Sequence, residues 1–250
     1  VISVPVSFTK SQRQATLRAA ALADLKVLSL INEPTAVAIN YFVAKKRQNH
    51  NFLVFDLGGG HFQASVFTII ENSLKVRAKS GASELGGIDL ISDVATHTGE
   101  KFQINSPDFI LKSGDKKFEL LKRKVEKGLC SLSLLPSTVL EIESFLEGKD
   151  LEVPIQRSEL EKLIDPWFKA ISKYLNEVLN AAKLQSVDID EVVLVGGSSR
   201  IPAIRIMLKQ YFNISRLNET VNADESVAYG CTYAAAVLQG ILRFGCRIFR

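Results

Sequence analysis

Asp56-Leu57-Gly58-Gly59-Gly60-His61-Phe62 is the stretch that decides the fold, and it follows the apolar run Phe52-Leu53-Val54-Phe55. A second glycine-rich stretch, Gly196-Gly197-Ser198-Ser199-Arg200-Ile201-Pro202, follows the apolar run Val192-Val193-Leu194-Val195. Glycines after a buried strand let the backbone turn sharply and approach a ligand without a clash at Cβ. Successive N–H groups in such a turn form a concavity that binds anions. Two of these turns in one chain predict a nucleotide held between two walls.

Each glycine turn also has a plain structural interpretation. Gly58-Gly59-Gly60 can be only a tight hairpin turn, and Gly196-Gly197-Ser198-Ser199 can be only the start of a helix. Asp56 favours the ligand-binding interpretation, because an unpaired carboxylate at the end of an apolar strand is costly to bury. A hydrated Mg²⁺ facing Asp56 would compensate that carboxylate. A helix after the second turn would offer its free N–H groups to phosphate.

Other polar residues near these turns are open to two interpretations. Glu33 is either a first-turn acid that complements the helix dipole or a carboxylate facing the nucleotide cleft. Arg200 can stack on a base, but the sequence alone favours a surface charge. We expect His50 and His97 to be exposed, whereas His61 lies inside the first glycine turn.

Composition sets limits on the protein class. The 250 residues are 46% hydrophobic and 23% charged, which is ordinary for a globular α/β protein. The net charge of +4 is too small to indicate a nucleic acid or a membrane as a partner. Cys130, Cys231 and Cys246 match no zinc or redox spacing and fit a reducing compartment, so we expect a cytoplasmic protein. The strand-like run at 1–6 leads us to interpret the chain as a piece of a longer protein.

Hydrophobic periodicity predicts strands that alternate with helices. Strands are expected at 1–6, 25–31, 52–55, 62–70, 74–78, 140–145, 151–155 and 191–195. Helices are expected at 11–24, 34–44, 88–102, 116–130, 166–184, 202–211 and 224–238. Ser158 is predicted to open a capping box with Glu161, and Asp224 to cap the last helix. Trp167 is expected in the core. This order predicts an α/β fold with a smaller α+β insertion in the middle.

Several stretches closely resemble the heat-shock protein 70 chaperone family, in the family's order and at its spacing. They are Pro5 with Ser11-Gln12-Arg13-Gln14-Ala15, Ile31–Ala36, Asp56–Gly60, Leu85–Asp89, Val193–Pro202 and Asp224–Gly230. The resemblance covers nearly the whole chain. It implies a nucleotide-binding domain with the actin-like ATPase (ribonuclease H-like) fold, in which two lobes surround a cleft. It also implies that 1–50 is the last part of lobe I, 51–85 with 156–240 the base of lobe II, 86–155 its upper α+β subdomain, and 241–250 an atypical tail.

The resemblance further implies an ATP-binding chaperone of the stress response that couples nucleotide state to the binding of unfolded polypeptides. The cofactors would be ATP or ADP with Mg²⁺. The clients would bind through a domain not in this chain, and the partners would be a J-domain co-chaperone and a nucleotide exchange factor, with no nucleic acid and no membrane.

By the same resemblance, the catalytic centre contains Glu33, Asp56, His61 and Gln63, and Asp56 holds Mg²⁺ through water. The nucleotide would be lined by Gly58, Gly59, Gly60, His61, Glu126, Lys127, Leu129, Cys130, Ser133, Gly196, Gly197, Ser198, Arg200 and Asp224. Pro5 and Arg13 match positions that relay the nucleotide state to the family's substrate domain.

The chain departs from the family at the site itself. The family has Thr in place of His61, Asp in place of Gln63, and a Lys-Arg pair where this chain has Leu129-Cys130. A cation packed on adenine contributes about 0.5–2 kcal/mol, so its loss weakens nucleotide affinity. Ile88 replaces an acid, and the family's first phosphate turn and catalytic lysine do not precede Val1. We therefore expect the fold to persist and ATP hydrolysis by this chain alone to be weak or absent.

Two alternatives remain at this point. The chain can be a non-hydrolysing relative that regulates other chaperones, or a decayed or partial copy, as His61, Gln63, Leu129 and Cys130 suggest. It can also be a sugar kinase or another actin-like ATPase, although the stretches at 32–36 and 196–202 argue against that interpretation.

Overall fold

The computed structural model describes residues 1–45, 48–71, 73–104, 114–146 and 148–242. In chain order its elements are β1 (Ile2–Val4), α1 (Lys10–Leu22), β2 (Leu30–Asn32), α2 (Glu33–Lys45), β3 (His50–Leu57), β4 (Phe62–Ile70), β5 (Ser73–Ala82), α3 (Gly87–Ile104), α4 (Lys116–Leu132), β6 (Ser137–Leu146), β7 (Lys149–Gln156), α5 (Arg157–Ala182), β8 (Glu191–Val195), α6 (Pro202–Phe212) and α7 (Ser226–Leu238). Short 3-10 helices occur at Ser186–Asp188 and Gly197–Arg200.

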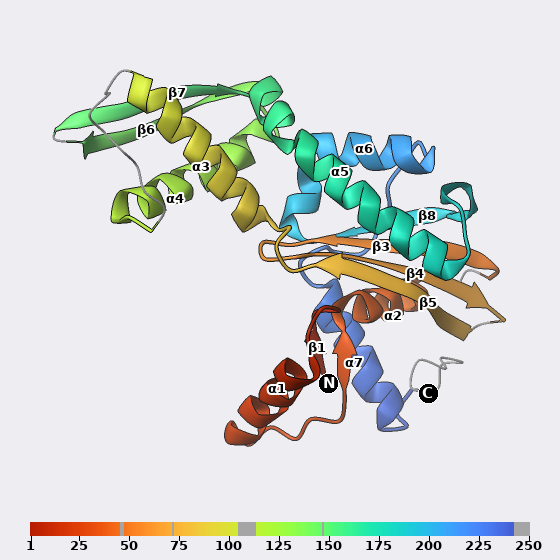
Figure 1. Ribbon diagram of the computed structural model, residues 1–250. Coiled ribbons are helices and arrows are strands. Elements are labelled where there is room, and N and C mark those ends of the chain that lie inside the picture. Colours follow the sequence, from red (N-terminus) through yellow and green to blue (C-terminus); the bar gives the residue numbers. More distant parts are fainter. Residues whose placement is uncertain (46–47, 72, 105–113, 147, 243–250) are drawn as a thin grey trace.

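The central sheet has the order β5-β4-β3-β8 and lies between two layers of helices (Figure 1). β4 runs antiparallel to both β3 and β5, and β8 pairs in parallel with β3. Helix α5 packs on β4 and β5 on one face, and α2 packs on the opposite face. β3, β4 and β8 are buried on both faces, which explains why these three strands read as nearly continuous apolar runs, whereas the edge strand β5 is mostly half-buried or exposed and is more polar.

Alternation along the strands divides the apolar side chains into two cores. Leu53 and Phe55 of β3 pack toward α5, whereas Phe52 and Val54 pack toward α2. The same alternation places Asp56 on the α2 side of the sheet, one residue before β3 ends. The Phe52 and Phe67 rings stack 5.4 Å apart within that core.

A second group of elements, α3, α4 and the β6–β7 hairpin, lies at one end of the molecule (Figure 1). It shares a continuous core with the α5 side of the sheet, and the edge-on rings of Phe102 and Phe145 lie within this core. Helix α5 runs from this group to the sheet. Its buried residues Leu160, Ile164, Trp167 and Ile171 keep one helical face through Pro166, so a single helix replaces the predicted break at 166.

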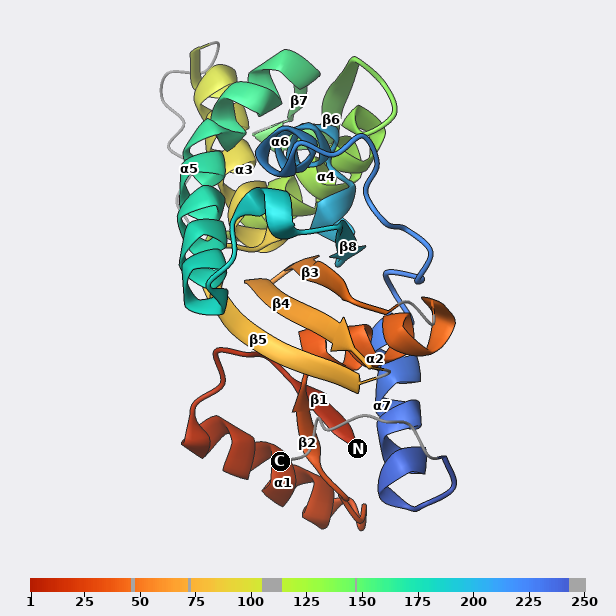
Figure 2. The same cartoon turned by 90° about the vertical axis from the view of Figure 1, so that its right-hand side faces the viewer.

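The third group contains β1, β2, α1 and α7, on the side of the sheet opposite to α5 and α6 (Figure 2). β1 and β2 form a parallel two-stranded sheet. Helix α7 packs on α2 so closely that a Cβ at Gly230 would lie 1.8 Å from the carbonyl oxygen of Ala36. Within the described residues, no helix combines the length and the apolar character needed to cross a membrane.

Several sequence predictions were wrong in detail. The strand expected at 25–31 is confined to Leu30–Asn32, and Leu25 and Leu28 are exposed. The capping box at the start of α5 is formed by Gln156 and Glu159 rather than Ser158 and Glu161.

The prediction for His50 was also wrong, because this side chain is buried. The Tyr41 hydroxyl lies 3.0 Å from its Nε2, and carboxylate oxygens of Asp190 and Glu191 each lie 3.4 Å from a ring nitrogen. His97, which was also predicted to be exposed, is half-buried. Trp167 is in the core as predicted.

Cys246 and the predicted atypical tail lie in the segment from residue 243 onward, which is outside the described residues.

Candidate functional site

Three glycine turns meet at the ends of β3 and β8 and at the start of α3. We call residues 58–60, 86–87 and 196–197 the glycine-turn cluster. The amides of Gly87 and Ile88 donate to the carbonyl oxygens of Gly58 and Gly59 at 2.9 and 2.8 Å. Added Cβ atoms would lie 2.4 Å from the Gly59 oxygen at Gly86 and 2.3 Å from the Leu57 oxygen at Gly196. The turns therefore contact one another through main-chain atoms, which only glycine permits at these positions.

Both plain interpretations of the glycine turns describe their local structure correctly. Gly58-Gly59-Gly60 connects β3 to β4 as a hairpin turn, and the Gly58 amide donates to the His61 carbonyl at 3.1 Å. Gly196 has φ +83°, after which Gly197–Arg200 forms a 3-10 helix that leads into α6. These local roles are compatible with ligand binding, because both turns border one cavity.

That cavity has a volume of about 470 Å³ and lies beside the glycine-turn cluster. Small-molecule sites usually have volumes of about 300–1,000 Å³ and mostly apolar linings, so the cavity has an appropriate size and character. One wall is a single face of α4, because Glu126, Leu129, Cys130 and Ser133 are spaced i, i+3, i+4 and i+7. Lys127, which was predicted to join them, is exposed and does not line the cavity.

The opposite wall is formed by Gly197, Ser198, Arg200 and Ile201, and Gly59 lies at the base. The Arg200 guanidinium bonds Asp224 at 2.7 Å, and both side chains are exposed. Asp224 is therefore engaged with Arg200, and the residue before α7 is Glu225, so the prediction that Asp224 caps the last helix was wrong.

Five cavity residues were not among the predicted site residues, namely Ile201 and four residues of α3. Gly87, Ile88, Leu90 and Ile91 come from the start of α3 and supply much of the apolar lining. The Gly86-Gly87 pair was the signal that could have identified this segment, since a glycine pair at a helix start resembles the other two turns.

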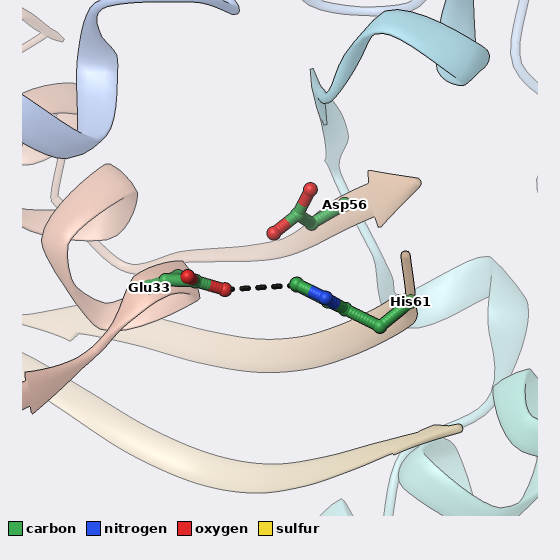
Figure 3. Close-up of side chains that lie close together, drawn as sticks. All are labelled: Glu33, Asp56 and His61. Atoms are coloured by element: carbon green, nitrogen blue, oxygen red, sulfur yellow. Dashed lines mark hydrogen bonds and ion pairs between the residues drawn. The ribbon is translucent and has the colours of Figure 1, made fainter. Parts of the chain in front are cut away.

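A second group of predicted residues lies on the α2 side of the sheet (Figure 3). Glu33 is the first residue of α2, Asp56 lies near the end of β3, and His61 immediately precedes β4. Nε2 of His61 lies 3.0 Å from Oε2 of Glu33. One potential ligand atom from each of the three side chains lies within 4.8 Å of the others.

Gln63 connects this group internally. It is the cross-strand partner of Asp56, and its Nε2 donates to Oε2 of Glu33 at 2.6 Å and to Oδ2 of Asp56 at 3.2 Å. Its Oε1 accepts from the Val6 amide at 2.5 Å. The Val6 contact fixes which end of the amide faces the carboxylates, so Gln63 presents donors to both of them.

The electrostatics follow from burial and from these contacts. Burial, and then the charge of Glu33, raise the pKa of Asp56 to about 6. Burial would also raise the pKa of Glu33, but the hydrogen bonds from His61 and Gln63 and the His61 charge together bring it below its usual value. The hydrogen bond to Glu33 outweighs burial and raises the pKa of His61. The cluster therefore favours an ion pair between Glu33 and His61, beside the Asp56 carboxyl group, whose pKa burial raises to about 6.

These residues fit a divalent cation, since buried Asp56 and partly exposed Glu33 and His61 converge on one point and supply oxygen and nitrogen ligands. The cavity and the carboxylate–histidine group are joined by the turn at 58–61, in which Gly59 lines the cavity and His61 contacts Glu33. Gly58, Gly60, His61, Gly196 and Asp224 do not themselves line the cavity.

The two predicted relay residues contact each other. Nη2 of Arg13 donates to the Pro5 carbonyl at 3.2 Å and to Oδ1 of Asn32 at 2.7 Å. Asn32 is the last residue of β2 and directly precedes Glu33. Arg13 therefore connects α1, the segment after β1, and the residue next to the carboxylate–histidine group.

A comparison with protein-family models matches residues 1–245 of the chain to the model described as Hsp70 protein. The match spans all the elements described above. The mixed α/β architecture is consistent with the actin-like ATPase fold of that family.

Proposed function

The chain belongs to the Hsp70 family, and we propose from this premise that it binds ATP or ADP with Mg²⁺ as part of an ATP-dependent chaperone. Family membership indicates a chaperone and nucleotide-binding role in general. The observation that supports nucleotide binding in this chain is the 470 Å³ cavity between one face of α4 and the turn at 197–201.

The proposed arrangement assigns the two residue groups to two parts of the nucleotide. The nucleoside would occupy the mostly apolar cavity beside Leu129 and Ile88, and the phosphates would extend along the turn at 58–61. Asp56 and Glu33 would face the cation, with Asp56 acting through water. Bound Mg²⁺ would supply charge neutralisation at the phosphate oxygens. The ligand would lie close against the main chain of the glycine-turn cluster, because glycines carry no Cβ to keep it away.

Calorimetric titration of ATP and ADP in the presence of Mg²⁺ tests this proposal. A Cβ at Gly197 would meet no heavy atom within 4 Å, so we expect Gly197→Val to fold and to take up part of the cavity beside the turn. We expect this variant to bind at least about tenfold more weakly, since a ligand cannot share the space that the added atoms occupy. Folded wild-type chain that binds neither nucleotide would overturn the proposal, as would unchanged binding by Gly197→Val.

A gain of affinity is the complementary test. Cys130→Arg places a cation on the cavity face of α4, and a cation over a base contributes about 0.5–2 kcal/mol, so binding should tighten about 2- to 30-fold. Leu120→Arg is the matched control, because Leu120 is exposed on the same helix and does not line the cavity. Equal tightening in both variants would show that only general charge attraction is involved.

One observation favours a second candidate function, that of a relative which does not hydrolyse ATP and regulates other chaperones. The Glu33 carboxylate lies 3.0 Å from the His61 ring and 2.6 Å from the Gln63 amide, so two side chains of the chain itself already bind it. In the full-length protein, His61→Thr with Gln63→Asp distinguishes the two candidates. Gain of ATP turnover would indicate a weakened ATPase, whereas loss of partner binding without turnover would indicate a regulator.

The family also works with client polypeptides and co-chaperones. We propose that unfolded polypeptides, a J-domain co-chaperone and an exchange factor act on the full-length protein in the cytoplasm. Co-purification with these partners in the presence of ATP, compared with ADP, would test this, and nucleotide-independent association would count against coupling.

A further inference from the structure

His61 changes what the carboxylate group at the sheet end can bind. Its Nε2, the Glu33 carboxylate and the Asp56 carboxylate come from three different elements and converge with ligand atoms within 4.8 Å of one another (Figure 3). One imidazole with two carboxylates is a ligand set suited to transition-metal ions, whereas Mg²⁺ prefers oxygen ligands alone.

We propose that Glu33, Asp56 and His61 bind a divalent transition-metal ion such as Zn²⁺ directly, and that they do so without nucleotide. Three protein ligands would leave the fourth position of a tetrahedral ion to water, as in catalytic zinc sites with three protein ligands. The proposal goes beyond the nucleotide function, in which Asp56 acts on Mg²⁺ only through water. It needs neither ATP nor the cavity, so either proposal can fail without the other.

The geometry requires only small side-chain movements. Ligand atoms about 2.0–2.2 Å from a tetrahedral ion lie about 3.3 Å from one another. The His61–Glu33 pair already lies at 3.0 Å, and the widest separation within the group is at most 4.8 Å. Asp56 is held by strand pairing on both sides, to Gln63 of β4 and Val195 of β8, so its backbone is fixed. Rotation of the partly exposed Glu33 and His61 side chains suffices to close the site.

Gln63 supports this arrangement as an outer partner of the ligands. Its amide donates to Glu33 and Asp56 at once, and the Val6 contact prevents it from turning its oxygen toward the metal. Partners that orient carboxylate ligands in this way are worth about 10–100-fold in metal affinity. The partial exposure of Glu33 and His61 leaves a route by which an ion can enter.

The test is calorimetric titration of Zn²⁺ and Mg²⁺ into the nucleotide-free chain. We expect one Zn²⁺ per chain, bound at least about tenfold more tightly than Mg²⁺, because only Zn²⁺ gains from the imidazole ligand. His61→Thr should weaken Zn²⁺ binding at least about tenfold, and Glu33→Gln should do the same by removing a carboxylate ligand. His97→Thr is the matched control, since His97 lies on α3 outside the group, and it should leave the affinity unchanged.

Co²⁺ provides a second readout that distinguishes this site from the thiols of Cys130 and Cys231. Ligation by nitrogen and oxygen gives visible d–d absorption without a sulfur-to-metal charge-transfer band. We expect the visible absorption in the wild-type and His97→Thr proteins and its loss in His61→Thr. Zn²⁺ affinity unchanged in a folded His61→Thr protein would overturn the proposal, as would a thiolate band or Zn²⁺ binding no tighter than Mg²⁺.

Discussion

Replacing Asp56 by Asn is expected to stabilise the chain at neutral pH. Asp56 is 6% exposed, and burial followed by the charge of Glu33 raises its pKa from 3.8 to about 6. Between these two values the folded chain binds more protons than the unfolded chain, so the free energy of unfolding falls as the pH rises. Above pH 6, the difference between these two pKa values lowers the free energy of unfolding by about 3 kcal/mol, at about 1.4 kcal/mol for each unit of pKa.

The assay is urea unfolding of the metal-free and nucleotide-free chain, followed by the fluorescence of Trp167, at pH 7.5 and pH 4.5. We expect Asp56→Asn to exceed the wild-type free energy of unfolding by up to about 3 kcal/mol at pH 7.5 and by only about 1 kcal/mol at pH 4.5. The raised pKa of His61 acts in the same direction, because its stabilising charge is lost as the pH rises through the folded value. The lowered pKa of Glu33 matters only at more acidic pH, where its stabilising charge is lost.

Asp165→Asn is the matched control, since Asp165 is an exposed carboxylate on α5 paired with Lys169 at 3.6 Å. This variant should change the free energy of unfolding by less than about 1 kcal/mol at either pH. Asp56→Asn that is no more stable than wild type at pH 7.5 would refute the reasoning. An equal gain at both pH values would also refute it, because the effect would then come from hydrogen bonding to Gln63 rather than from the buried charge.

Three further substitutions test the packing and the surface. Gly230→Ala should lower the free energy of unfolding by about 1–3 kcal/mol in urea titration, since its Cβ would lie 1.8 Å from the Ala36 oxygen. Phe67→Ala should cost about 3–5 kcal/mol in the same titration, because the ring is fully buried, and a loss below 1 kcal/mol would contradict the two-core description. Arg200→Ala should shift stability by less than about 1 kcal/mol, as the pair with Asp224 is exposed, and a larger thermal shift would indicate a structural role.

The elements with the strongest local signals could be predicted from the sequence. The prediction for β8 at 191–195 matches the structure residue for residue, and the glycine turns at 58–60 and 196–197 follow their strands as expected. Apolar runs that end in glycine leave the chain few alternatives. The family resemblance also marked the helix face that lines the cavity, at 126, 129, 130 and 133, and the role of these residues in nucleotide binding stays a prediction.

The remaining features depend on contacts between distant segments, which no local pattern contains. The apolar stretch at 25–31 reads as a strand, but only Leu30–Asn32 finds a partner, namely β1. His50 follows polar residues and was predicted to be exposed, yet Asp190 and Glu191, which are far away in sequence, lie against its ring. The role of Gln63 likewise could not be read locally, since it depends on the Val6 amide and on the start of α2.

The glycine-turn cluster has a practical consequence for engineering ligand preference. Its outline is set by main-chain atoms, so substitutions elsewhere leave the base of the cavity unchanged, whereas any side chain at Gly86 or Gly196 would push the turns apart. Four side chains of the cavity wall instead share one helical face, at 126, 129, 130 and 133. A combinatorial library limited to those four codons would therefore vary the ligand preference of this protein while keeping the shape of the cavity base constant.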